Sequence, residues 1–177
     1  MISDENDFLT YQLYTASKSL RIKKARSRSR LIMTITSLCV AYLFFSNEND
    51  ILGYYFLGIS ILALLFYPLF TRWRYKQHYL KHIRETYKNR IGEVGELEFE
   101  TDTIRTKDRT GEVKIYKSEI EEVNEIRDYY FLKTRSGVSL IISKTKADDI
   151  ENIRNEIKSL VETRGVKHNI ELDWKWK

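Results

Sequence analysis

The run ILGYYFLGISILALLFYPLF, at residues 51–70, gives the strongest structural signal in the chain. It contains no charged residue, and as an α-helix it would be about 30 Å long, which matches the hydrocarbon core of a bilayer. The run is apolar all round, whereas a core helix of a soluble protein keeps a polar stripe. We therefore expect a transmembrane helix here. A pair of buried helices in a soluble bundle is the alternative.

A second uncharged run, residues 31–46, precedes the first, and only residues 47–50 separate the two. Its sixteen residues would form a helix of about 24 Å. Such a helix crosses a bilayer when flanking arginines snorkel or the bilayer thins locally. Because the connection is short, the sequence predicts an antiparallel transmembrane hairpin over residues 31–70, with spans 31–46 and 51–70.

Positive charge is concentrated at the two outer ends of this hairpin. Residues 17–30 hold seven Lys and Arg and no acid, residues 72–90 hold seven more, and residues 47–50 hold none. Lys and Arg are in excess in the cytoplasmic segments of membrane proteins. We therefore expect a multi-pass protein of the inner cell membrane with both termini in the cytoplasm.

The basic flanks also predict contact with anionic lipid, because Lys and Arg close to a bilayer are attracted to it. A role as topology signals alone is the alternative, and the two roles are compatible. The lipid bilayer is thus an expected partner, whereas nucleic acid is not, since the positive charge is confined to these flanks. The candidate contacts to anionic lipid are Lys23, Lys24, Arg26, Arg28, Arg30, Arg72, Arg74 and Lys76.

Two helical segments are expected to flank the hairpin. Within residues 1–30, apolar side chains recur at helical spacing from residue 7 to 22, and neither Gly nor Pro separates them from the basic run. This segment is predicted to be an amphipathic and basic cytoplasmic helix that continues into the membrane. Residues 71–90 also lack Gly and Pro and are predicted to extend the second span as a basic juxtamembrane helix.

After residue 91 the pattern changes from helical spacing to alternation. Apolar and polar residues alternate in several short runs, strictly so at 96–100, and Lys107–Gly111 is a turn signal. The runs 129–135 and 138–143 flank Ser136-Gly137, which is typical of a hairpin turn. Isoleucines at 150, 153 and 157 then lie on one helical face, and Gly165 is a C-cap signal. Residues 91–177 are therefore predicted to form a cytoplasmic α+β domain of about six antiparallel strands, capped by a C-terminal helix.

Aromatic side chains of this domain are the candidate contacts to a protein partner: Tyr129, Phe131, Trp174 and Trp176. In the tail, the two tryptophans follow Ile170 and Leu172 in strict alternation. This spacing favours an added edge strand with all four side chains on one face. A tail that lies on the bilayer surface, with its indoles at head-group depth, is the alternative.

The order of segments resembles that of the bacterial YcxB-like family. The resemblance rests on Asp7-Phe8, on Ser17-Lys18, and on residues 120–142 with their hydrophobic strand, aromatic hairpin and closing strand. It implies a membrane α-helical hairpin joined to a PH-like cytoplasmic domain, a small antiparallel β-barrel or sheet. The chain departs from the family pattern in having Ile142-Ser143-Lys144 where Ile-Pro-Lys is usual.

The sequence contains no motif of established catalytic chemistry: no Gly-rich phosphate loop, Cys/His cluster or Gly-x-Ser-x-Gly elbow. We accordingly predict no catalytic, cofactor-binding or metal-binding residues. The predicted function is that of a membrane-anchored, non-enzymatic binding or adaptor protein, which presents its cytoplasmic domain to a protein partner or to a second copy of itself. The alternatives are an immunity or regulatory protein that neutralises a membrane-acting toxin, and an unrecognised membrane enzyme.

Overall fold

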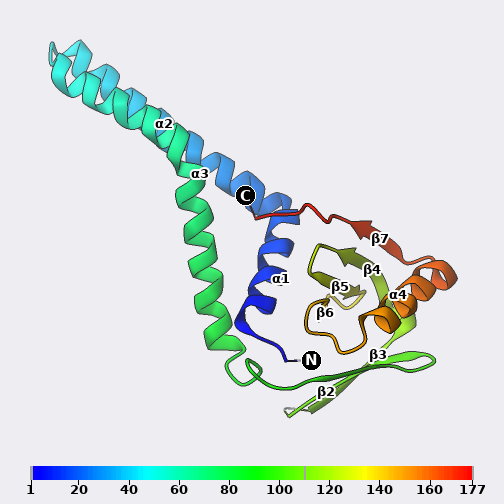
Figure 1. Ribbon diagram of the computed structural model, residues 1–177. Coiled ribbons are helices and arrows are strands. Elements are labelled where there is room, and N and C mark those ends of the chain that lie inside the picture. Colours follow the sequence, from blue (N-terminus) through cyan, green and yellow to red (C-terminus); the bar gives the residue numbers. More distant parts are fainter. Residues whose placement is uncertain (1, 110, 177) are drawn as a thin grey trace. The chain divides into compact units, whose positions relative to one another are not determined.

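The computed structural model of the protein describes residues 2–109 and 111–176 (Figure 1). The chain divides into two compact units. The hairpin unit comprises Gln12–Tyr79 together with Trp176, and it contains most of the long helices. The sheet unit comprises residues 2–11 together with Leu80–Lys175, and it contains every β-strand of the described chain.

Helix α1, Glu5–Lys18, begins with a reciprocal cap. The Asp4 carboxylate accepts a hydrogen bond from the Asp7 main-chain N–H at 3.0 Å, and the Asp7 carboxylate accepts one from the Asp4 N–H at 2.7 Å. Each carboxylate thus satisfies a donor that a helix start leaves unpaired. The helix ends before Ser19, whose hydroxyl caps the next helix by accepting from the Ile22 N–H at 3.4 Å. The continuous helix expected over residues 1–30 is therefore wrong at Ser19, because a serine hydroxyl favours the start of a helix over its interior.

Two long helices follow, α2 at Leu20–Ser46 and α3 at Asp50–Thr86. Each is long and apolar enough to cross a membrane, and few residues of its apolar stretch are buried within the protein. At 1.5 Å per residue they measure about 40 Å and 55 Å, so each exceeds the hydrocarbon thickness of a bilayer. The basic run before the first span belongs to α2. Helix α3 runs through Pro68 and past the second span, as the sequence predicts for residues 71–86.

Small residues let α2 and α3 approach each other closely. A side chain in place of Gly53 would meet the Phe45 ring at 2.6 Å, so any larger residue there would require that ring to move. The small side chains buried along the two helices are Ser37, Ala41, Ser60 and Ala63. Such residues are typical of helix contacts in membranes. The Ser37 and Ser60 hydroxyls donate to carbonyls of their own helices, which agrees with a structural role for them.

The sheet unit contains two β-sheets (Figure 1). The first is antiparallel, in the order β1-β2-β3, and the second is ordered β6-β5-β4-β7. In the second sheet β7 pairs with β4 in parallel, whereas the other pairs are antiparallel. The strands are β1 Glu96–Phe99, β2 Thr103–Asp108, β3 Gly111–Tyr116, β4 Ile120–Glu125, β5 Tyr129–Thr134, β6 Ser139–Ser143 and β7 Lys167–Ile170. Thr110, in the predicted turn between β2 and β3, lies outside the described residues.

This arrangement corrects the expected antiparallel barrel or sheet. The described strands form no closed barrel, because β3 and β4 are separated by the 3-10 turn η1, Lys117–Glu119, instead of pairing with each other. Strand β4 also changes register between Ile120 and Glu122, which interrupts its ladder with β5. The PH-like fold stays a prediction. The strands expected over 96–100, 129–135 and 138–143 are confirmed as β1, β5 and β6, each one residue shorter, and the Ser136-Gly137 turn is confirmed between the last two.

One apolar core joins the two sheets to helix α4, Ile150–Arg164. The helix starts at Asp149, whose carboxylate accepts from the Asn152 N–H at 3.0 Å, and ends at Gly165, which has a left-handed φ of 63°. Its buried face packs against both sheets. The fully buried members of the core are Ile104, Val123, Leu132 and Ile142, and the helix contributes Ile153, Ile157 and Leu160.

We predict that Leu132→Asp unfolds the sheet unit. Leu132 is completely buried in β5, so an unpaired carboxylate there should cost on the order of 3–5 kcal/mol. Hydrogen exchange of the full-length protein in detergent should show loss of protection across β4, β5 and β6. Val138→Asp is the matched control, since Val138 is exposed in the same hairpin and should leave the protection unchanged. Equal protection in the two variants would contradict this core.

Candidate functional site

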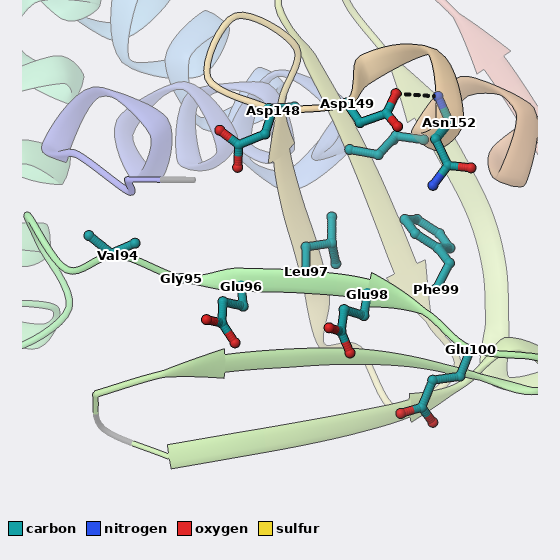
Figure 2. A pocket seen from close by; sticks show the side chains of 12 residues that line it. Val94, Gly95, Glu96, Leu97, Glu98, Phe99, Glu100, Asp148, Asp149 and Asn152 are labelled. Carbon is teal, nitrogen blue, oxygen red and sulfur yellow. Dashed lines mark hydrogen bonds between the residues drawn. The ribbon is translucent and has the colours of Figure 1, made fainter.

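The sheet unit contains an open groove of 670 Å³ between β1 and the start of α4 (Figure 2). We call it the β1 groove. Strand β1 is an edge strand, because only β2 pairs with it. The opposite wall of the groove is formed by Ala147, Asp148, Asp149, Asn152 and Ile153. The groove therefore opens beside a sheet edge, where a further strand has room.

The main chain of β1 has hydrogen-bonding groups on the side away from β2. The Glu100 N–H donates to the Thr103 carbonyl at 2.9 Å, which sets the alternation of the β1–β2 ladder. Hydrogen-bonded pairs alternate with non-bonded pairs in an antiparallel ladder. The next hydrogen-bonded pair along this ladder is Glu98 with Arg105. The N–H and C=O groups of Leu97 and Phe99, which belong to non-bonded pairs, therefore point away from β2. They lie on the side of β1 that none of the described strands pairs with.

Side chains alternate along the same strand. Figure 2 shows Leu97 and Phe99 on the side of β1 that faces α4, and Glu96 and Glu98 on the opposite side. Leu97 and Phe99 pack against the core and give the groove an apolar floor. The β1 groove thus combines a free strand edge with one apolar and one acidic face.

The acidic residues along β1 differ in how far their charge is neutralised. Glu98 pairs with Arg105 of β2. Glu100 accepts from the Thr103 hydroxyl at 2.6 Å, and this bond, together with Lys114 and Arg105, lowers the pKa of the Glu100 carboxyl. Among the described residues, no cation lies within salt-bridge distance of the Glu96 carboxylate. Glu96 thus differs from Glu98 and Glu100 in forming no salt bridge within the described part of the chain.

Two of the predicted partner contacts, Tyr129 and Phe131, are buried within the sheet unit. Their rings stack 5.8 Å apart, and Tyr11 of α1 packs edge-to-face on Phe131 at 5.4 Å. They are therefore core residues that hold α1, and they do not offer a surface to a partner. Alternation along a strand cannot tell a buried aromatic residue from an exposed partner contact, because both sides of β5 are covered here.

The contact of α1 with β5 is centred on Asp7, a buried carboxylate that sequence reasoning assigned no role. Its oxygens accept hydrogen bonds from the Tyr129 hydroxyl at 2.9 Å and from the Lys146 ammonium at 2.7 and 2.9 Å. Burial raises the pKa of Tyr129, and the neighbouring Asp7 raises it further. Burial lowers the pKa of Lys146, but its bonds to Asp4 and Asp7 outweigh this, so that the pKa lies above its ordinary value. Lys146 therefore stays charged and Tyr129 stays protonated at neutral pH.

The tail differs from the expected eight-residue strand. Strand β7 ends at Ile170, and both Ile170 and Leu172 are exposed, so the four apolar side chains do not share one face. Trp174 is half-buried in the sheet unit. Trp176 is buried in the hairpin unit, where its indole N–H donates to the Arg72 carbonyl at 3.2 Å. The chain therefore turns after β7, which breaks the alternation on which the prediction depended.

Some of the candidate lipid contacts lie together in the hairpin unit. Lys23, Arg26 and Arg30 of α2 line a second groove, of 210 Å³, with Ser27 of the same helix. Its other wall belongs to α3 and consists of Tyr67, Pro68 and Thr71. We call this the basic groove. The other candidates do not line it: Lys24, Arg28, Arg72, Arg74 and Lys76.

Aromatic rings fix one side chain of the basic groove. The Arg26 guanidinium lies 5.0 Å from the centre of the Trp176 ring and 5.8 Å from that of Tyr75. Stacking on aromatic faces holds the plane of an arginine while leaving its N–H groups available. Arg26 is thus held by two aromatic rings, and neither contact was visible as local sequence, since Tyr75 and Trp176 follow it by 49 and 150 residues.

Comparisons with protein-family models, with curated proteins and with solved structures found no match to this chain.

We predict that Asp7→Asn releases the start of the chain from the sheet unit. The amide leaves Lys146 with one carboxylate fewer and weakens the bond from Tyr129, at a cost of about 1–3 kcal/mol. Hydrogen exchange at residues 2–11 should accelerate. The control is Glu5→Gln, on the same helical turn, because Glu5 forms an exposed pair with Arg84 that should contribute less. Equally fast exchange in both variants would show that Asp7 has no special role.

Proposed function

We propose that the protein is a membrane-anchored, non-enzymatic adaptor of the bacterial inner membrane, whose sheet unit binds an extended segment of a protein partner in the β1 groove. The observation that carries the proposal is the free edge of β1, open to a groove of 670 Å³. A segment added beside β1 would gain main-chain hydrogen bonds from Leu97 and Phe99. This mode of recognition takes affinity from the main chain and specificity from alternate side chains.

The two faces of β1 define the partner's sequence pattern. Partner residues on the inner face would meet the apolar floor formed by Leu97 and Phe99. Partner residues on the outer face would lie opposite Glu96 and Glu98, and opposite charges across neighbouring strands stabilise the pair. We therefore infer a partner segment in which apolar residues alternate with Lys or Arg.

Membrane anchoring is supported by the two apolar helices and by the distribution of charge around them. Helices α2 and α3 are both long enough to span a bilayer. Because seven basic residues stand on each outer flank and none in the connecting loop, the proposed topology places both termini in the cytoplasm. The PH-like domain and the likeness to the YcxB-like family belong to this proposal and agree with a binding role.

The topology is testable with reporters. We expect alkaline phosphatase fused after the last residue to be inactive in a bacterial host and green fluorescent protein at the same position to fluoresce, since both reporters would remain in the cytoplasm. A cysteine that replaces Asn49, in the loop, should react with a membrane-impermeant maleimide added from outside. A cysteine at the exposed position Gln77 on α3 is the matched control and should not react. Phosphatase activity at the C-terminus would refute the proposed orientation.

Partner binding is testable by crosslinking in cells. A photoreactive amino acid at position 96 should capture a protein, whereas the same residue at exposed position 113, on β3 at the opposite edge of the sheet, should not. Glu96→Lys should reduce capture from a reactive group at position 95 about tenfold, because it repels a basic segment. Glu162→Lys makes the same charge change at the far end of α4 and should leave capture unchanged. Equal yields at positions 96 and 113 would contradict the proposed site.

A further inference from the structure

We infer that the basic groove is a binding site for the phosphate group of an anionic phospholipid. This site lies in the hairpin unit and rests on the proposed membrane anchoring, not on the adaptor function. General attraction of basic flanks to a bilayer would involve all their Lys and Arg alike. The groove instead selects Lys23, Arg26 and Arg30, which differ from the other basic residues of α2 in facing α3 across a cavity.

In the described part of the chain, no carboxylate neutralises the charge of the groove. Lys23, Arg26 and Arg30 recur at helical spacing, so they share one face of α2. Between residues 17 and 84 the only acids are Glu48 and Asp50, in the loop at the far end of the hairpin. Within the described residues no carboxylate lies within salt-bridge distance of these three cations. Their mutual repulsion favours an anion between them.

The geometry of the groove suits a phosphate. Arg26 is held in place by Trp176 and Tyr75, and a fixed guanidinium can donate two parallel hydrogen bonds to phosphate oxygens. Lys23 and Arg30 lie one helical turn before and after it, and both are exposed. The three side chains can therefore converge on one anion, with Arg26 as its most rigid donor.

The depth of the groove points to a lipid rather than a soluble phosphate. Arg30 directly precedes the first apolar run, and the opposite wall, with Tyr67 and Pro68, lies at the end of the second. These positions correspond to the level of the head groups, where tyrosine is enriched. Leu31 and Phe70, next to the groove on the apolar side, are both exposed and can contact acyl chains. A phospholipid would thus have its phosphate in the groove and its chains along the hairpin.

The test is a titration of the full-length protein, in an uncharged detergent, with short-chain phosphatidylglycerol, followed by native mass spectrometry. Lys23→Gln/Arg30→Gln should weaken binding about tenfold or more, because two cations of the site are lost. Lys24→Gln/Arg28→Gln removes the same charge from the same helix outside the groove and should change binding less than about twofold. The charge-preserving variant Lys23→Arg/Arg30→Lys should bind like the wild type.

Each outcome decides between a site and a diffuse effect. Equal weakening in the two Gln variants would overturn the proposal, as would loss of binding in the charge-preserving variant. Inorganic phosphate that binds as tightly as the lipid would assign the groove to a soluble anion and overturn the lipid. Short-chain phosphatidylcholine that binds as tightly would show that negative charge is not recognised. If the double variant does not accumulate, the single variants Lys23→Gln and Arg30→Gln, compared with Lys24→Gln and Arg28→Gln, give the same comparison.

Discussion

The buried carboxylate of Asp7 connects the start of the chain to the sheet unit, and the arrangement of that unit depends on it. Asp7 caps its own helix and accepts hydrogen bonds from Tyr129 on β5 and from Lys146 between β6 and α4. A buried charge is tolerated only when it is paired and hydrogen-bonded, and Asp7 has both kinds of partner. Through these bonds α1 covers β5, so that Tyr129 and Phe131 become core residues.

This contact has a consequence for the order of folding. The chain passes between the two units three times, after Tyr11, after Tyr79 and after Lys175. Residues 2–11 therefore complete a unit whose other residues are synthesised only after the whole hairpin. Contacts so distant in sequence form late because the intervening loop must close first. Helices α2 and α3, in contrast, meet across a short connection, as the contact of Gly53 with Phe45 illustrates, and this contact needs no such closure.

The two grooves have a common origin in elements that lack a neighbour on one side. Strand β1 stays an edge because the sheets do not close into a barrel, and the β1 groove lies beside that edge. The basic groove lies between α2 and α3, and basic side chains of α2 line one of its walls. One groove has an acidic outer face and the other a cationic lining, which suits them to ligands of opposite charge. An adaptor that binds lipid with its hairpin and a basic segment with its sheet unit would use both.

Local patterns in the sequence were sufficient for the elements that depend on near neighbours. The uncharged runs predicted both long helices, the alternation at 96–99 and the Ser136-Gly137 turn predicted strands of each sheet, and Gly165 marked the end of α4. The three cations of the basic groove were among the predicted lipid contacts because their helical spacing and their position just before the first span can be recognised from neighbouring residues alone. Ser19 was missed as a helix start because its hydroxyl is one weak signal within a strongly helical run.

Tertiary structure alone decided the features that join distant residues. The parallel pairing of β7 with β4, the bonds of Asp7 and the burial of Trp176 against Arg72 each connect positions separated by 40 or more residues. The periodicity of the sequence does not predict such pairs, because the residues around a carboxylate or an indole are the same whether the group faces water or contacts a partner. Whether Tyr129 and Phe131 faced outward depended on α1, which covers them from more than a hundred residues away. The hydrophobic effect determines which residues leave water, but only the path of the whole chain determines what they meet there.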